Sequence, residues 1–176
     1  MGDTYERELK AILSGDEKAL TKMVRTCDEE ETEGYLSIRK RPFMVVRAAG
    51  SLGIDLVAIW GDLALPIEVK SSKNGVLWFS NSQRLLEQGE MFIEECDRCG
   101  LVPTYAFRLK GFRGDPWRLF ALPSKKVNGR LSLVQRRLPG PDESSKGNYI
   151  LRWDDGMKLS KLLHYLVELS TPLNGE

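Results

Sequence analysis

Short apolar runs rich in β-branched and aromatic side chains recur through the middle of the chain, and this character favours strands. The runs cover residues 43–47, 55–60, 65–70, 76–79, 104–109, 117–122 and 149–153. Turn formers separate the runs at 55–60 and 65–70, which predicts an antiparallel pair. We expect residues 76–79 to join the same sheet and residues 149–153 to form an edge strand.

Apolar residues at helical spacing predict amphipathic helices near both ends and in the middle of the chain. These helices cover about residues 5–14, 17–27, 82–99 and 159–167. Ser14 and Glu17 have the spacing of a capping box for the second helix, and Ser80 or Ser82 can cap the third. We expect the acidic run that follows the second helix to be a loop, and the Gly-, Pro- and Lys-rich residues 123–148 to be a flexible basic excursion.

Length and composition suit one globular domain. The chain has 176 residues, of which 41% are hydrophobic and 29% are charged. No apolar run approaches the ~20 residues that a membrane span needs. Because the N-terminus also lacks a signal-peptide pattern, we expect a cytoplasmic protein with no membrane partner.

The net charge of +1 is low for a nucleic-acid-binding protein. Basic clusters still allow one basic face, because an acidic run at 28–31 offsets them in the total; taken singly, each is more often a solvated surface. The clusters lie at residues 39–41, 125–126 and 136–137.

The chain has three cysteines, and this odd number argues against a disulfide framework. Cys96 and Cys99 have the spacing of a zinc or redox motif, but structural zinc needs four ligands. We therefore expect a reduced pair on a helix.

Three polar side chains mark the paired strands at 55–60 and 65–70. Side chains two residues apart in a strand share a face, so Glu68 and Lys70 lie together while Val69 turns toward the core. Antiparallel pairing brings Asp55 close to Glu68. Two neighbouring carboxylates repel unless a cation lies between them, and an all-oxygen site suits Mg²⁺ or Mn²⁺. Such an ion with a lysine beside it is typical of phosphodiester cleavage.

A same-face ion pair on a solvated strand is the alternative interpretation of Glu68 and Lys70, because the motif alone is weak. The small-residue loop at 48–53 leads directly into Asp55 and lets the backbone approach a ligand, although its glycines suit an ordinary turn equally well. Lys73 follows the second strand in a polar turn, where it is positioned to meet a phosphate.

Four blocks in a fixed order resemble the archaeal-type Holliday junction resolvases of the PD-(D/E)XK nuclease superfamily, whose members are cellular or viral. The blocks are residues 5–9, 45–51, 54–58 and 67–71. The resemblance implies an α/β, restriction-endonuclease-like fold, in which helices flank a central mixed β-sheet, and a single nuclease domain over residues 1–176. The chain departs from the family at about residues 16–41, where a helical and acidic segment is inserted as a substrate-shaping element or, as we favour, a local brace.

The resemblance also implies roles for individual residues. Asp55 and Glu68 would be metal ligands, the Val69 backbone carbonyl would complete the site, and Lys70 would serve the attacking water. Glu6, on the first helix, would lie beside the metal as a catalytic residue and candidate ligand. The remaining implied residues are Ser51 near the scissile phosphate, and Arg7 and Arg47 on the DNA backbone.

The implied function is a Mg²⁺-dependent, structure-selective endodeoxyribonuclease, with Mn²⁺ as a substitute ion, that resolves four-way DNA junctions by paired symmetric nicks. A homodimer suits two related nicks, and the helix ending near Cys99 has more apolar residues than one core-facing stripe needs. Two alternatives are a restriction or repair endonuclease of the same superfamily and an inactive DNA-binding protein of the same fold. The expected location is the nucleoid-containing cytoplasm, or the host cytoplasm for a viral protein.

Overall fold

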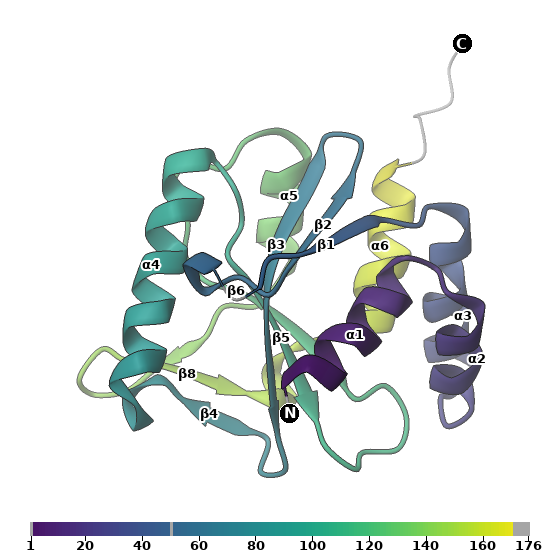
Figure 1. Ribbon diagram of the computed structural model, residues 1–176, viewed down its shortest axis with the longest axis horizontal. Coiled ribbons are helices and arrows are strands. Elements are labelled where there is room, and N and C mark those ends of the chain that lie inside the picture. Colours follow the sequence, from purple (N-terminus) through teal and green to yellow (C-terminus); the bar gives the residue numbers. More distant parts are fainter. Residues whose placement is uncertain (1, 50, 171–176) are drawn as a thin grey trace.

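A six-stranded sheet lies at the centre of the molecule, between α4 on one side and α1 and α6 on the other (Figure 1). The structure, a computed structural model, describes residues 2–49 and 51–170. The strand order is β1-β2-β3-β5-β6-β9, and only the β3–β5 pairing in this sheet is parallel, among the described residues. The strands are β1 (Met44–Arg47), β2 (Leu56–Trp60), β3 (Leu63–Ser72), β5 (Thr104–Leu109), β6 (Trp117–Ala121) and β9 (Met157–Lys158). The prediction of a mixed sheet flanked by helices is confirmed.

The hairpin of β2 and β3 confirms the predicted antiparallel pair. Trp60 faces Leu63 across a turn in which Gly61 has φ +55°, a conformation that glycine adopts without strain. β3 then continues beside β5, where Glu68 is the register partner of Tyr105. β3 thus pairs with β2 up to Ile67 and with β5 from Ile67 onward, and the polar residues Glu68 and Lys70 lie just past this change of partner.

A second, three-stranded sheet has the order β4-β8-β7. Its strands are β4 (Val76–Trp78), β7 (Asp142–Glu143) and β8 (Tyr149–Arg152). Two predictions are therefore wrong: β4 does not join the main sheet, and β8 is central in its sheet rather than an edge strand. Apolar runs indicate strands but do not name their partners, and here Leu77 pairs with Leu151, far along the chain.

The predicted first, third and last helices are confirmed as α1 (Gly2–Leu13), α4 (Gln83–Cys99) and α6 (Leu159–Ser170). The Ser82 side chain caps α4 by accepting a hydrogen bond from Leu85 N at 3.1 Å. The cysteines Cys96 and Cys99 are free and lie on α4, as expected. No helix within residues 2–49 and 51–170 has the length and hydropathy of a membrane span.

The prediction of a flexible excursion at 123–148 is wrong, because this segment contains β7 and the helix α5 (Gly129–Arg137). Leu131, Val134 and Leu138 form a buried apolar stripe that joins the core on the α1 and α6 side of the sheet. A basic composition concealed this periodicity. Four short 3₁₀ helices complete the structure: Ile38–Lys40, Ser51–Gly53, Phe79–Asn81 and Trp153–Asp155.

Residues 16–41, which the sequence predicts to be an insertion, contain two helices, α2 (Glu17–Val24) and α3 (Glu29–Ser37). The side chain of Asp16, and not Ser14, caps α2 by accepting a hydrogen bond from Ala19 N at 2.9 Å. The acidic run expected as a loop instead begins α3, because Asp28 and Glu31 form a capping box. The two ends of this segment lie side by side, since Phe43 N donates a hydrogen bond to the Leu13 carbonyl at 2.9 Å.

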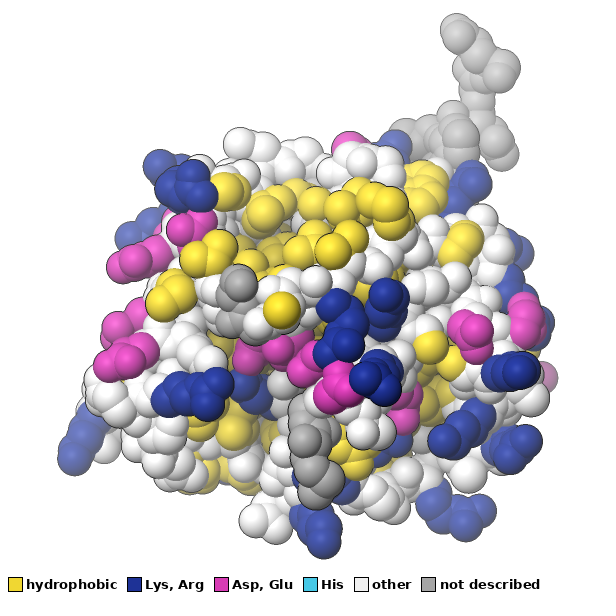
Figure 2. Space-filling model, viewed as in Figure 1, with side chains coloured by type: hydrophobic (Ala, Val, Ile, Leu, Met, Phe, Trp, Pro, Cys, Tyr) yellow, Lys and Arg dark blue, Asp and Glu magenta, His cyan; other side chains and the backbone are white. Residues whose placement is uncertain are grey.

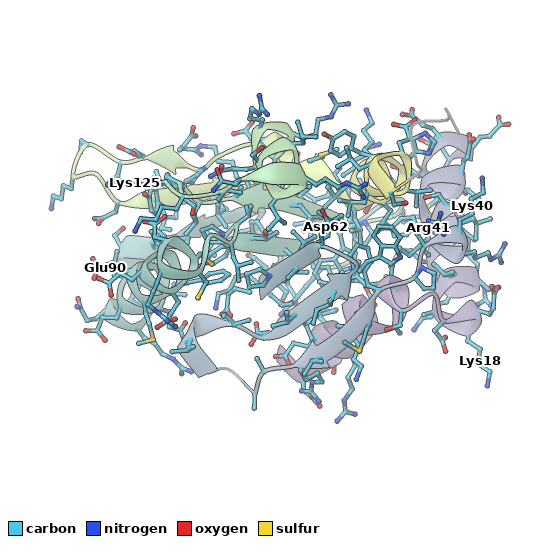
Figure 3. All side chains as sticks on the ribbon, turned by 90° about the horizontal axis from the view of Figure 1, so that it is seen from above. Lys18, Lys40, Arg41, Asp62, Glu90 and Lys125 are labelled. Carbon is cyan, nitrogen blue, oxygen red and sulfur yellow. The ribbon has the colours of Figure 1, made fainter. Side chains whose placement is uncertain are left out.

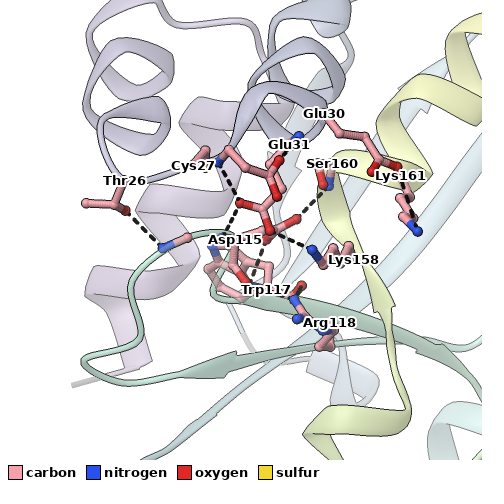
Figure 4. A network of polar contacts seen from close by, with 12 residues as sticks. Thr26, Cys27, Glu30, Glu31, Asp115, Trp117, Arg118, Lys158, Ser160 and Lys161 are labelled. Carbon is pink, nitrogen blue, oxygen red and sulfur yellow. Dashed lines mark hydrogen bonds and ion pairs between the residues drawn. The ribbon is translucent and has the colours of Figure 1, made fainter.

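A buried polar network ties the insertion to the rest of the protein (Figure 4). Asp115 is fully buried, and its Oδ1 accepts hydrogen bonds from Tyr35 Oη at 2.6 Å and Trp117 N at 3.0 Å. Its Oδ2 accepts from Ser160 N, in the first turn of α6, at 2.9 Å. One carboxylate therefore joins α3, β6 and α6, an arrangement that supports a bracing role for the insertion.

Candidate active site

Asp55, Glu68 and Lys70 lie together where the β2–β3 hairpin meets β5. The backbone of Asp55 is held between two strands, because its N–H donates to the Ile67 carbonyl at 3.0 Å and its carbonyl accepts from Ala48 N at 2.8 Å. Asp55 Oδ2 accepts a hydrogen bond from Val69 N at 2.8 Å. This bond directs the Asp55 carboxylate toward the middle of β3.

Alternation along β3 gives Glu68 and Lys70 a common face, as predicted. Lys70 Nζ donates to Glu68 Oε1 at 2.6 Å, while Val69 packs against the main apolar core on the other face. Glu68 is 4% exposed, whereas the Lys70 side chain is 19% exposed. The carboxylate is therefore buried, and the amine beside it reaches toward solvent.

The electrostatics of Glu68 are those of an incompletely compensated buried charge. Burial raises the pKa of Glu68 to about 7, against the opposing effect of the Lys70 ion pair, and the nearby Asp55 carboxylate adds to the rise. Glu68 Oε2 is buried and has no hydrogen-bond partner among the described residues. Near neutral pH, Glu68 is poised between its two protonation states, and a cation beside it would favour the charged one.

Tyr105 forms part of this site, and sequence reasoning missed it. It is the β5 register partner of Glu68 and packs against the rings of Phe79 and Phe92 at centroid distances of 5.4 and 5.8 Å. Burial raises the pKa of Tyr105, and the charges of Glu68 and Asp55 raise it further. The alternating pattern placed Tyr105 on a strand, but the parallel register that sets it beside Glu68 has no local signal.

The loop that leads into Asp55 is held against α4. Gly53 has φ +69°, and a Cβ atom there would lie 2.9 Å from the Gln88 carbonyl oxygen of α4. Ala49 and Leu52 also have positive φ values, of 53° and 58°, which are unfavourable for residues other than glycine. The loop thus adopts a strained path beside the site, and Gly53 is required by a close approach rather than by an ordinary turn.

Glu6 and Arg47 pair with each other beside the site. Arg47 Nη2 donates to Glu6 Oε2 at 2.9 Å and also contacts Asp3, which in turn binds Arg7 at 2.6 Å. The structure therefore places Glu6 in a network with arginine rather than in a group with both Asp55 and Glu68. Arg7 keeps a side chain that is 69% exposed.

Two other predicted residues lie in loops. Lys73 is exposed in the turn after β3 and has no ion-pair partner among the residues that the structure describes. Ser51 begins a 3₁₀ helix, but its side chain lies outside the described residues. Their predicted roles remain predictions.

The donor set at this site fits a hard divalent cation. Glu68 offers a buried oxygen without a partner, and Asp55 Oδ1 accepts no hydrogen bond from the described residues. Mg²⁺ commonly binds one or two protein carboxylates and completes its shell with water and phosphate oxygens. Within residues 2–49 and 51–170, no group of three or more acidic, His or Cys side chains could hold a metal, so these two carboxylates would be the protein's charged ligands.

Comparison with known proteins identifies the fold. No protein-family model and no curated protein matches the chain. Among solved structures, it is similar to the 1.6 Å resolution structure of Archaeoglobus fulgidus Hjc, a Holliday junction resolvase from an archaeal hyperthermophile. The two chains are 20% identical with a TM-score of 0.50, and the similarity covers 93% of this chain and 95% of that one. The chain therefore has the mixed α/β nuclease fold of that resolvase, as the restriction-endonuclease-like prediction expected.

Proposed function

We propose that this protein is a metal-dependent endodeoxyribonuclease that resolves four-way DNA junctions by paired symmetric nicks. The observation that carries the proposal is the buried, partnerless oxygen of Glu68 beside Asp55 and Lys70, in a chain that shares its fold with a resolvase. A buried carboxylate in an ordinary core would be fully hydrogen-bonded. A bound cation would supply the missing partner here.

Asp55, Glu68 and the Val69 carbonyl would hold Mg²⁺, or Mn²⁺ in its place. Such an ion supplies Lewis-acid charge to a phosphate oxygen and lowers the pKa of a bound water. Lys70 orients the attacking water and stabilises negative charge near the phosphate, since its ammonium is anchored by Glu68 and reaches solvent. Glu6 holds Arg47 at the DNA-facing edge, and Arg7 and Lys73 contribute exposed positive charge.

A homodimer would place two such sites on one junction. In the structure, α4 buries Phe92 and Cys96 within its own chain, so it offers less free apolar surface than the sequence suggested. Exposed apolar side chains instead include Met44 and Val46, which are 63% and 49% exposed on the edge strand β1. Figure 2 shows apolar side chains gathered in a band across the upper middle of this view, where β1 and β2 lie in Figure 1. We propose this band as the dimer surface.

The test compares a labelled mobile four-way junction with a linear duplex of the same sequence, with Mg²⁺ and with a chelator. We expect paired nicks in the junction alone, dependent on Mg²⁺. Glu68→Gln should abolish nicking and keep junction binding, while Glu143→Gln, which changes an exposed carboxylate on β7, should nick and bind the junction as the wild type does.

Each result that differs from this expectation would indicate another function. Efficient cutting of the linear duplex would indicate a restriction or repair endonuclease of the same superfamily. Junction binding with no Mg²⁺-stimulated nicking would indicate an inactive DNA-binding protein. Full activity of Glu68→Gln would remove the proposed mechanism.

A further inference from the structure

The outer face of α2 carries a stripe of cations that no acid neutralises. Lys18, Lys22 and Arg25 follow one another at i, i+4 and i+7, on the side opposite the buried residues Leu20 and Met23. All three cations are exposed, and none has an ion-pair partner in the part of the chain that the structure describes. A purely structural helix gains nothing from three unpaired like charges on one face.

Two acids near this stripe are engaged elsewhere. Glu17, in the first turn of α2, pairs with Arg39 at 2.7 Å. Glu8, on α1, accepts two hydrogen bonds from Arg108 at 2.8 and 3.2 Å. The positive charge of α2 is therefore free to attract an anion.

A groove lies beside the stripe. It has a volume of about 360 Å³ and lies between α1, α2 and the loop between β5 and β6, and its lining includes Arg7, Lys22, Arg108 and Phe112. Arg108 is the register partner of Ser71, the residue that follows Lys70 on β3. Arg108, in the floor of the groove, therefore lies next to the strand position that follows Lys70. Its side chain is on the opposite face of the sheet from Glu68 and Lys70.

The charge and dimensions of this surface match a DNA backbone. Lys18 and Arg25 lie about 10 Å apart along the helix axis, roughly the rise of three base pairs. Phe112 is 42% exposed at the edge of the groove, and the half-buried Lys110 and the exposed Arg113 lie close to it in sequence. Figure 2 shows Lys and Arg side chains gathered at the lower right, over α2 and the loop between β5 and β6.

We propose that α2 and this groove bind the phosphate backbone of one duplex arm of the DNA substrate. The inference rests on the proposed function for the identity of the substrate, and it gives the insertion a role in addition to bracing. Lys18, Lys22 and Arg25 contact phosphates, and the groove beside Lys22 leads the same arm toward the end of β3. These contacts depend on phosphate charge and not on base sequence, so they can be made to any duplex arm of the junction.

The test removes the stripe and measures the salt dependence of junction binding. The triple variant Lys18→Gln, Lys22→Gln, Arg25→Gln keeps helix propensity and removes three charges. The matched control removes three exposed lysines elsewhere: Lys125→Gln, Lys126→Gln, Lys146→Gln. Lys18 and Lys125 lie at opposite ends of the molecule (Figure 3). Binding of a labelled four-way junction is measured in chelator over a range of salt concentrations, after circular dichroism has shown that both variants are folded.

For the α2 variant, we expect the slope of log K against log salt to fall in magnitude by about 2 to 3, and affinity near 0.1 M salt to weaken by roughly 10- to 100-fold. The control should keep the wild-type slope. An unchanged slope in the α2 variant, or an equal loss in the control, would overturn the inference.

Nicking at saturating protein separates this inference from the proposed function. The α2 variant should nick the junction at the wild-type rate once bound, because its changed residues lie outside the catalytic cluster. If the wild-type protein binds the junction and never nicks it, the proposed function fails while the salt-slope comparison still decides the role of α2.

Discussion

Replacing Glu68 with Gln should make the metal-free protein more stable, although it removes a central catalytic residue. Glu68 is 4% exposed, one of its oxygens has no partner, and its pKa rises from 4.5 to about 7 on burial. The folded state therefore keeps the proton to a higher pH than the unfolded state does. Stability linked to this proton is fully present below pH 4.5 and is lost as the pH rises through 7.

The size of the effect follows from the shift. A rise from 4.5 to about 7 corresponds to about 3 kcal/mol of free energy of unfolding lost by the wild type once Glu68 is ionised. Gln has no charge to bury, so the variant should exceed the wild type by about 3 kcal/mol at pH 8.5 and by less than about 1 kcal/mol at pH 5.

Urea unfolding in chelator at several pH values measures this difference directly. Glu143→Gln, at an exposed carboxylate, serves as the control and should follow the wild type throughout. A Glu68→Gln variant that is less stable than the wild type at pH 8.5, or a difference that does not change with pH, would refute the reasoning.

Three further predictions concern single side chains. Asp115→Ala should lower the free energy of unfolding by about 3 to 5 kcal/mol in chemical denaturation, because three buried donors lose their acceptor; a loss below about 1 kcal/mol would contradict the bracing role. Lys70→Met should slow junction nicking by about 10² to 10⁴-fold with affinity unchanged, and a purely structural Lys70 would leave the single-turnover rate intact. Gly34→Ala should destabilise by about 1 to 3 kcal/mol, since a Cβ there would lie 2.4 Å from the Ser160 carbonyl oxygen; Gly140→Ala, where the nearest atom is 3.9 Å away, is the control, and equal thermal shifts would count against the argument.

The parts of the site that the sequence predicted are those fixed by local rules. Glu68 and Lys70 share a face because strand side chains alternate, and Asp55 reaches them because a short turn joins two neighbouring strands. The cap of α4 was narrowed to Ser80 or Ser82 for the same reason, since capping depends on residues three positions apart, and the structure shows Ser82. These relations need no knowledge of distant parts of the chain.

The parts that were missed depend on distant partners. β4 pairs with β8, and nothing near Leu77 indicates Leu151 as its neighbour. The acidic residues at the start of α3 resembled a solvated loop, but Glu31 is buried and paired with Lys158 at 2.7 Å. Tyr105 reaches Glu68 through a parallel register that only the folded sheet defines.

The joined ends of the segment predicted to be an insertion, and the buried Asp115 that this segment contacts, have an evolutionary consequence. Because Phe43 N bonds the Leu13 carbonyl, an ancestral gene could have gained the intervening segment without moving the helix and strand on either side. Once Asp115 had come to accept a hydrogen bond from Tyr35, however, excision would remove one of the three donors to this buried carboxylate. Gain of such a segment would therefore be structurally easy and its loss difficult, so we expect homologous proteins to retain both residues or to lose both together.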